Sequence, residues 1–385
     1  MEGIDVHLLR LKKIYGDVFT LWLPFPTVVI GGHEALKRTI VRDGESYAGR
    51  PDTYIMVLLV QGNYGLLFEE NDWYRSQRRF TIQTLKNLGV GKDAIKNAVG
   101  NVINQLAFGY VRPPEDTEIV RFQFLLNEVF EHFNSPKMLL LDVVPFLRHF
   151  DHFLGLGIES TLHGNDAILE FIQKEFENHK RMINYDQEPT NYLDAYIHEI
   201  HRREKEGIKD EFTEKQCVVA IYDLYSAGLE TIVNTLRFCF IFILNYPLIQ
   251  ERIHKEIDDA IGREREITMD DQKILPYTCA FLQEVYRAGY VVSVNFLRIT
   301  TEDVECEGYK LRRGTRVIPQ FPSVHMDESI YPRPELIIPE RHLKVSKLSA
   351  ESEVGESILR RSFPIYCSFT FCSATASLSN SMLMI

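Results

Sequence analysis

The side chains with the clearest chemical potential lie at the centre of one long apolar stretch, Thr213 to Asn245. There, Gly228 is followed within three residues by Glu230 and Thr231. A glycine inside a helix costs about 1 kcal/mol relative to alanine, and a carboxylate among apolar residues is costly unless it has a partner. Two explanations are open. The glycine is a packing notch beside one solvated turn, or the turn is distorted beside a buried reaction centre where Glu230 and Thr231 move protons.

A second group of candidate functional side chains combines one indole with three guanidinium groups. Trp73 is followed closely by Arg75, Arg78 and Arg79. Such a cluster is typical of a solvated basic helix face. It also suits an anion site, because a guanidinium group binds a carboxylate through two parallel hydrogen bonds and the indole N–H adds a further donor.

Glu284 and Arg287 form a third pair, three residues apart in a segment that predicts a helix from Pro276 to Gly289. Residues at this spacing lie on one helix face, and proline is favoured in the first helical turn. Alone, such a pair is a common surface ion pair with little effect on stability.

The element that must position the first group is the apolar stretch itself, which predicts one long helix. Thr213 can cap the first free amides while Gln216 reaches back to the cap, which is the capping-box arrangement. Pro247 cannot continue the helix. At 1.5 Å per residue, roughly 33 residues would span about 50 Å. Apolar residues on most faces favour a helix that runs through a protein interior.

The remaining segments predict a mainly α protein with small β-sheets. We expect two strands around Pro24-Phe25-Pro26, and a β-meander followed by a proline-rich segment near the C-terminus. The expected helices are 7–16, 33–42, 72–88, most of 93–206, and 247–262; the expected strands are 17–23, 27–30, 291–299, 304–306, 309–311 and 315–318.

Composition excludes several classes of protein. A hydrophobic content of 45% in 385 residues is ample for a large core. The net charge of −11 argues against nucleic acid as a partner. Six scattered cysteines without a Cys-x-x-Cys pair predict a reducing compartment. The N-terminus has no apolar region typical of a signal peptide. The sequence contains no run of 18 apolar residues, so no membrane-spanning segment is predicted.

Together these motifs resemble the cytochrome P450 family of haem-thiolate monooxygenases, and within it the animal microsomal branch that acts on drugs, steroids and fatty acids. The resemblance extends from Leu11 to Leu343, and its motifs occur in family order and spacing. They are Tyr15-Gly16-Asp17-Val18-Phe19, Arg78-Arg79-Phe80, Ala227-Gly228-Leu229-Glu230-Thr231, Leu275-Pro276-Tyr277, Glu284-Val285-Tyr286-Arg287, Thr300-Thr301-Glu302-Asp303-Val304, Asp327-Glu328 and Pro339-Glu340-Arg341.

The resemblance implies the cytochrome P450 fold, truncated at both ends, over residues 7–345. Residues 346–385 would be a tail that lacks the family's haem loop. It also implies roles at the centre of the long helix. Gly228 would open a groove where dioxygen binds. Thr231 would donate a hydrogen bond to oxygen as it is reduced, and Glu230 would relay the protons needed to cleave the O–O bond.

The same resemblance assigns the charged residues. Arg78 and Arg298 would donate to the haem propionates, and Trp73 would contact the haem. The spacing from Trp73 to the arginines is one residue longer than in the family, so either Tyr74 takes its place or the helix turns differently there. A further set, Glu284, Arg287 and Arg341, would form a buried structural triad beneath the haem.

The C-terminus departs from the family pattern Phe-x-x-Gly-x-Arg-x-Cys-x-Gly. Cys367 lies 26 residues after Arg341 (367 − 341), close to the family separation, and is the candidate iron ligand by distance only. In a competing partial match Glu353 takes the place of the cysteine. The last 24 residues carry no charge. They are interpreted as a weak tail anchor or as a misread exon or shifted reading frame.

The resemblance implies haem b as cofactor and an NADPH-dependent flavoprotein reductase as electron donor. The substrate would be a small lipophilic molecule, in xenobiotic, lipid or steroid metabolism, held by loops such as 50–68 and 185–190 and by the helix before Ala227. The protein would lie on the cytosolic face of the endoplasmic reticulum membrane, with the cytoplasm as the alternative because no anchor is found. The alternative function is a catalytically dead or incomplete family fragment without haem, which could bind hydrophobic molecules.

Overall fold

The computed structural model describes residues 4–23, 25–51, 54–62, 64–66, 72–88, 99–113, 116–133, 141, 144–155, 157–209, 211–265, 268–290 and 296–343. These residues form two compact units. Unit 1 takes the described residues up to Pro51 and those from Thr231 onward, and unit 2 takes those from 54 to Glu230. Most of the described secondary structure is helical, and both small sheets belong to unit 1. This confirms the prediction of a mainly α protein with small β-sheets.

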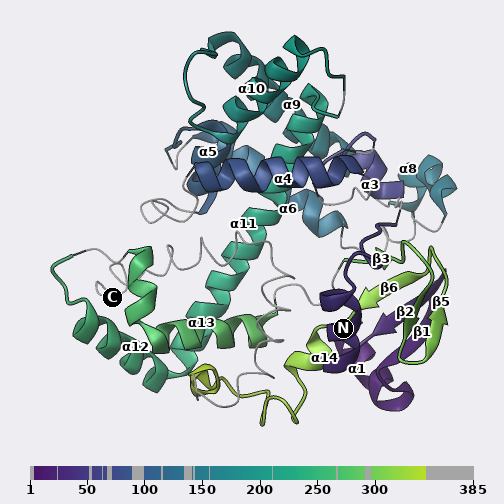
Figure 1. Cartoon of the computed structure of the whole chain (residues 1–385), viewed down its shortest axis with the longest axis vertical. Coiled ribbons are helices and arrows are strands. Elements are labelled where there is room, and N and C mark those ends of the chain that lie inside the picture. Colours follow the sequence, from purple (N-terminus) through teal and green to yellow (C-terminus); the bar gives the residue numbers. More distant parts are fainter. Residues whose placement is uncertain are drawn as a thin grey trace. The chain divides into compact units, whose positions relative to one another are not determined.

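Unit 1 contains a four-stranded sheet with the order β1-β2-β6-β3 (Figure 1). β1 (Val18–Leu23) pairs antiparallel with β2 (Phe25–Ile30), as predicted. β2 then pairs in parallel with β6 (Arg316–Pro319), and β6 pairs antiparallel with β3 (Arg298–Ile299). On one side, Leu8 of α1 (Ile4–Tyr15) packs with Phe19 and Val29 of the first two strands.

The predicted β-meander is wrong in its last strand. β4 (Val304–Cys306) and β5 (Tyr309–Leu311) form a separate two-stranded sheet, and β6 does not join it. The turn before β6 is held against Thr300 instead, whose hydroxyl donates to Arg312 O at 2.7 Å and accepts from Thr315 N at 3.0 Å. Pairing with β2 buries Val317 completely, so long-range packing outweighs the local hairpin preference. Of the predicted strand 291–299, residues 291–295 lie outside the described residues.

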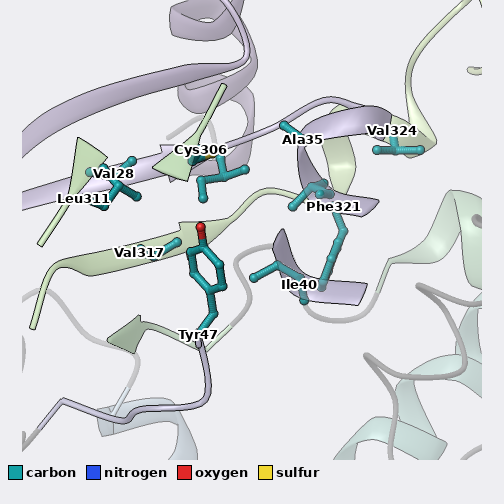
Figure 2. Packing of buried hydrophobic residues seen from close by; sticks show 11 residues of the cluster. Val28, Ala35, Ile40, Tyr47, Cys306, Leu311, Val317, Phe321 and Val324 are labelled. Carbon is teal, nitrogen blue, oxygen red and sulfur yellow. The ribbon is translucent and has the colours of Figure 1, made fainter. Parts of the chain in front are cut away.

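Tyr47 lies in the hydrophobic core between the two sheets of unit 1 (Figure 2). Its side chain is fully buried beside Val317 and Ile40, and its ring points toward the strands that carry Leu311 and Cys306. Among the described residues, its hydroxyl has no hydrogen-bond partner. Burial raises the pKa of Tyr47 well above its usual value, so the group stays neutral.

Replacing Tyr47 with phenylalanine is therefore expected to stabilise the protein by about 1 kcal/mol, because it removes a buried unsatisfied hydroxyl and keeps the ring. Urea-induced unfolding would measure the change. Tyr196→Phe is the matched control with the opposite expected sign, since the buried Tyr196 hydroxyl donates to Gln77 Oε1 at 2.8 Å. A less stable Tyr47→Phe variant would show that the hydroxyl has an energetically useful partner.

The helices of unit 1 form a second core, in which α12 and α13 pack together with the end of α11. Glu256 of α12 accepts hydrogen bonds from the first free amides of α13, Tyr277 N at 2.7 Å and Thr278 N at 2.8 Å. The predicted helix 33–42 is an α-helix that continues as a π-helix. The helical segments are α2 (His33–Leu36), the π-helix Lys37–Arg42, α12 (Pro247–Ala260), the 3₁₀ turns Met269–Ile274 and Pro339–His342, α13 (Pro276–Gly289) and α14 (Pro322–His325).

In the described part of unit 2 all regular elements are helices. They enclose an aromatic core that includes Phe108, Phe122, Phe171 and Tyr225. Its elements are α3 (Tyr54–Leu59), α4 (Asp72–Asn87), α5 (Val99–Phe108), α6 (Thr117–Phe133), the 3₁₀ helix Pro145–Phe150, α8 (Asp151–Leu154), α9 (Ile158–Met182) and α10 (Tyr192–Lys205). The loop between α5 and α6 is tied to α9 by Arg112, which binds the buried Glu175 at 2.8 Å.

The long helix α11 (Glu214–Asn245) confirms the prediction from the apolar stretch. At its start, Gln216 N donates to Thr213 Oγ1 at 3.2 Å, as the capping motif predicts. The second half of the predicted capping box is wrong, because the Gln216 side chain binds Gly65 instead of the cap. A main-chain peptide offers the amide of Gln216 a donor and an acceptor together, whereas the cap would satisfy only one of its atoms.

Candidate functional site

The central turn of α11 carries the predicted proton-transfer pair. The side chain of Thr231 is partly buried, and its carbonyl oxygen accepts a hydrogen bond from Thr235 Oγ1 at 2.8 Å. The side chain of Glu230 lies outside the described residues. A Cβ atom at Gly228 would lie 3.1 Å from Ile103 Cδ1 of α5. This close contact supports the packing-notch explanation for the glycine, and the dioxygen groove remains a prediction.

The three arginines of the predicted anion site lie on exposed positions of α4, while other positions of this helix are buried. Gln77 and Thr81 are buried and hydrogen-bond to tyrosines of α10. Arg75, Arg78 and Arg79 are exposed, which fits the solvated basic face and leaves all three guanidinium groups accessible to an anion. The side chain of Trp73 lies outside the described residues.

Arg298, the other predicted propionate donor, lies on β3 of unit 1, whereas Arg78 belongs to unit 2. Its side chain is partly buried, and Arg298 Nη1 donates to the carbonyl oxygen of Tyr47 at 3.3 Å. A main-chain contact of this kind orients the guanidinium group.

Glu284, Arg287 and Arg341 come together in unit 1. Both Glu284 and Arg287 are fully buried on α13, and they form a two-point pair: Arg287 Nε and Nη2 each donate to one carboxylate oxygen at 2.8 Å. Arg341 Nε donates to Glu284 Oε1 at 3.2 Å. The pair is therefore an interior ion pair with a third cationic partner, unlike the surface pair that its spacing alone would suggest.

A fourth side chain, His342, joins this cluster and was missed by the sequence analysis. His342 Nε2 lies 2.8 Å from Glu284 Oε2. Burial by itself raises the pKa of Glu284, but the hydrogen bonds from Arg287 and His342 outweigh burial and hold this pKa at about 2. Glu284 is therefore ionised at neutral pH. The available signal was the position of His342, which directly follows Arg341.

The cluster ties α13 to the chain between 325 and 343 through main-chain atoms as well. Arg287 Nη1 donates to His325 O at 2.8 Å. Ile338 N donates to Glu284 Oε1 at 3.0 Å, and Arg341 Nη2 donates to Arg333 O at 2.8 Å. With every polar atom of the ion pair engaged, the cluster fixes one arrangement of these segments.

His325 is a buried side chain that this cluster does not use. Among the described residues neither of its ring nitrogens has a hydrogen-bond partner. Burial, with a further contribution from the charge of Arg287, lowers the pKa of His325 to about 4, so the imidazole is neutral. An unused buried donor and acceptor fits a polar partner from outside the described residues.

Three of the four described cysteines are buried. Burial raises the pKa of Cys217 and Cys239, and raises that of Cys306 to about 11, so these three remain thiols at neutral pH. The fourth, Cys279, donates through Sγ to Gln272 O at 3.5 Å. In the described part of the chain, His, Cys, Asp and Glu side chains form no group of three that could hold a metal ion. Cys367, the predicted ligand, lies outside this part.

Comparison with known proteins identifies relatives along most of the chain. The family model described as cytochrome P450 matches residues 2–99 and 91–357. The chain is 51% identical over 373 residues to the probable cytochrome P450 CYP36A1 of Caenorhabditis elegans. The aligned region covers 89% of this chain and 76% of that protein. It is 30% identical over 370 residues to cytochrome P450 2C7 of Rattus norvegicus (88% and 74% covered) and 29% identical over 375 residues to cytochrome P450 2C5 of Oryctolagus cuniculus (90% and 75%).

Proposed function

Because the chain belongs to the cytochrome P450 family, we propose that it inserts one oxygen atom from dioxygen into a small lipophilic substrate, using electrons from an NADPH-dependent flavoprotein reductase. The family is one of haem monooxygenases, and haem b with its iron is the family cofactor. The observation that supports the proposal in this chain is the ion-pair cluster of Glu284, Arg287 and Arg341, in which Glu284 and Arg287 are fully buried.

In the proposed site, Arg78 and Arg298 hold the propionates of the cofactor. Bound haem supplies the activation of dioxygen. Thr231 holds a proton at its hydroxyl for oxygen as it is reduced, and Glu230 passes protons to it from solvent. Cys367 is the proposed iron ligand.

The Glu284 cluster has a structural role in this proposal and no part in proton transfer. Its carboxylate is saturated by five hydrogen bonds from Arg287 (two), Arg341, His342 and Ile338 N. A carboxylate with a pKa of about 2 is a poor proton donor at neutral pH. We assign it the task of keeping α13 and the segment 325–343 in one arrangement.

For the electron donor, α4 offers the exposed guanidinium groups of Arg75 and Arg79. Positive side chains on a helix surface attract a partner with an acidic surface and raise its association rate. These two arginines are therefore proposed contacts of the flavoprotein reductase, and the interaction is expected to weaken as ionic strength rises.

A membrane surface is the other proposed partner, at the cytosolic face of the endoplasmic reticulum. In unit 2, Phe146, Phe150 and Phe153 are 65%, 44% and 91% exposed on the 3₁₀ helix Pro145–Phe150 and α8. Exposed aromatic side chains of this kind favour the interface between lipid and water. Among the described helices, α11 is the one whose length and apolar composition would allow it to cross a membrane. A helix in the core of a protein can have the same length and composition.

The experiment that tests the proposed function is the carbon monoxide difference spectrum of the reduced protein with haem supplied. A strongly red-shifted Soret band would show a thiolate on the iron, and its loss in Cys367→Ser but not in Cys372→Ser would assign the ligand. No haem uptake, or the band of a non-thiolate complex, would overturn the proposal. The comparisons give no support to the alternative of a catalytically dead fragment.

Replacing Thr231 with alanine is expected to lower product formation on the order of 10²-fold, since a positioned proton donor contributes at least that much. NADPH oxidation should continue, so the product formed per NADPH falls. Thr235→Ala is the matched control, because it removes a threonine hydroxyl one turn away that donates to Thr231 O. An unchanged ratio of product to NADPH in Thr231→Ala would remove Thr231 from proton delivery.

A further inference from the structure

The four-stranded sheet of unit 1 has one covered edge and one open edge. At the β3 edge, Gly49 N donates to Ile299 O at 3.1 Å, and Ile299 N donates to Gly49 O at 2.9 Å. At the opposite edge, β1 pairs with β2, and in the described part of the chain no strand lies on its outer side. An open edge strand presents a row of main-chain donors and acceptors that another strand can use.

Two hydrogen bonds at the end of this sheet fix which pairs of β1 and β2 are bonded. Gly31 N donates to Asp17 O at 2.7 Å, so these residues form a bonded pair just beyond the two strands. Gln320 N donates to Ile30 O at 2.8 Å, so the carbonyl group of Ile30 points toward β6 and away from β1. Bonded and non-bonded pairs alternate along an antiparallel ladder. The pair that contains Ile30 is therefore non-bonded.

The residue of β1 opposite Ile30 is Val18, and the next non-bonded positions are Thr20 and Trp22. Because the main-chain groups of these three residues do not bond to β2, their N–H and C=O groups point to the open edge. Their side chains all lie on one face of the sheet, since side chains alternate along a strand. The open edge therefore has three regularly spaced pairing positions.

β1 lacks the features that protect most edge strands. Its residues, Val18-Phe19-Thr20-Leu21-Trp22-Leu23, include no charged residue, proline or glycine, and its pairing with β2 has no bulge. The side chains around the edge are accessible on both faces. On one face Thr20 is exposed and Trp22 is 76% exposed. On the other, Tyr15 of α1 is 65% exposed, with its ring 6.3 Å from that of Phe19.

The three pairing positions are complementary to a second copy of themselves. When two β1 strands lie antiparallel and centred on Thr20, the two Thr20 residues face each other, and Val18 of each copy faces Trp22 of the other. Each of these pairs can exchange two main-chain hydrogen bonds. An aromatic side chain opposite a β-branched one stabilises a sheet. Asp17 of each copy faces the apolar Leu23 of the other, so no like charges meet.

We propose that β1 is the contact between two copies of this chain, whose four-stranded sheets join into one continuous sheet across a two-fold axis at Thr20. Each copy uses its one open edge, so the assembly closes at two. A single strand pair is a small interface, and the dimer is expected to form reversibly above about 10 µM protein. No charged side chain of β1 takes part, so added salt should leave the dimer intact. The proposal is independent of the proposed function.

Hydrogen exchange in the full chain tests the register residue by residue. Between about 1 µM and about 200 µM protein, amide exchange at Val18, Thr20 and Trp22 is expected to slow about fivefold or more, because these amides bond only in the dimer. The amides of Phe19 and Leu21 already face β2, so their exchange should not change. Equal slowing of both sets, or slowing of neither, would overturn the proposed pairing.

Sedimentation velocity over the same concentrations tests the dimer and its contact. Thr20→Lys places two ammonium groups opposite each other at the two-fold axis, and it is expected to raise the dissociation constant of the dimer about tenfold or more. Thr190→Lys is the matched control, since it adds the same charge at an exposed threonine of unit 2. A dimer that withstands Thr20→Lys would show that β1 is not the contact. A wild-type protein that stays monomeric, with Trp22 shielded only when lipid vesicles are added, would assign this edge to a membrane surface and overturn the proposal.

Discussion

Replacing Arg287 with alanine is expected to lower the free energy of unfolding by about 3–5 kcal/mol, because it leaves the buried carboxylate of Glu284 without its main partner. Arg287 supplies two of the hydrogen bonds to Glu284, one to His325 O and one to Leu336 O. All four disappear in the variant, and Glu284 keeps only Arg341, His342 and Ile338 N as partners. Urea-induced unfolding at neutral pH measures the loss.

Two further variants separate charge from geometry. Arg287→Lys keeps the positive charge but cannot donate at fixed angles to both oxygens of Glu284 and to His325 O, so an intermediate loss is expected. The double variant Glu284→Gln with Arg287→Met removes both charges, and it should recover part of the stability lost in Arg287→Ala. If Arg287→Ala loses less than about 1 kcal/mol, the pair behaves as an exposed ion pair and the structural role of the cluster is wrong.

Acidification from pH 6.5 to pH 4 is expected to destabilise the protein by about 3 kcal/mol through His325 alone. Its pKa falls from 6.5 to about 4 in the folded protein, chiefly through burial. Above pH 6.5 the ring is neutral in both states and contributes nothing. Between pH 6.5 and 4 the unfolded chain binds a proton that the folded protein excludes, so stability falls with pH. Below pH 4 both states are protonated, and the loss is complete.

The measurement is the free energy of unfolding at several pH values between 7 and 4.5, for wild type and His325→Gln. The variant cannot take up the proton, so its pH dependence should be flatter by this amount. His149→Gln is the control, since His149 is exposed. Glu284 titrates in a lower window, because its pKa is depressed to about 2. Its contribution is present above pH 4.5 and lost as the pH falls through 2. Parallel pH curves for wild type and His325→Gln would contradict the prediction.

Sequence reasoning located the elements whose ends are marked by local chemistry. Thr213 and Pro247 bracket α11, and Pro276 and Gly289 bound α13, because capping hydroxyls, proline rings and glycine act within one helical turn. The spacing of Glu284 and Arg287 placed them on one face for the same reason. Partners that lie within a few residues can be predicted from such rules.

Partners that lie far apart in sequence were missed. Gln216 matched a capping box, yet its amide binds Gly65, 151 residues away. β6 matched a meander, yet it pairs with β2 from the other end of unit 1. His342 had only its place next to Arg341 as a signal for joining Glu284, 58 residues away. For Gln216 and β6 a local interaction competed with a buried long-range one, and the buried contact was stronger because it satisfied more polar atoms or removed more apolar surface from water.

Holding the segment around Gly65 by its main chain has a consequence for how this protein can diversify. Substitutions at Tyr64 or Leu66 would change the side chains of this segment while its backbone stayed in register, since the bonds from Gln216 and Asp223 use main-chain atoms of Gly65 and Leu66. Gly65 is the exception, because a Cβ atom there would lie 2.4 Å from Asp223 Oδ2. Neighbouring positions can therefore change one at a time without loss of the contacts that hold this loop on α11.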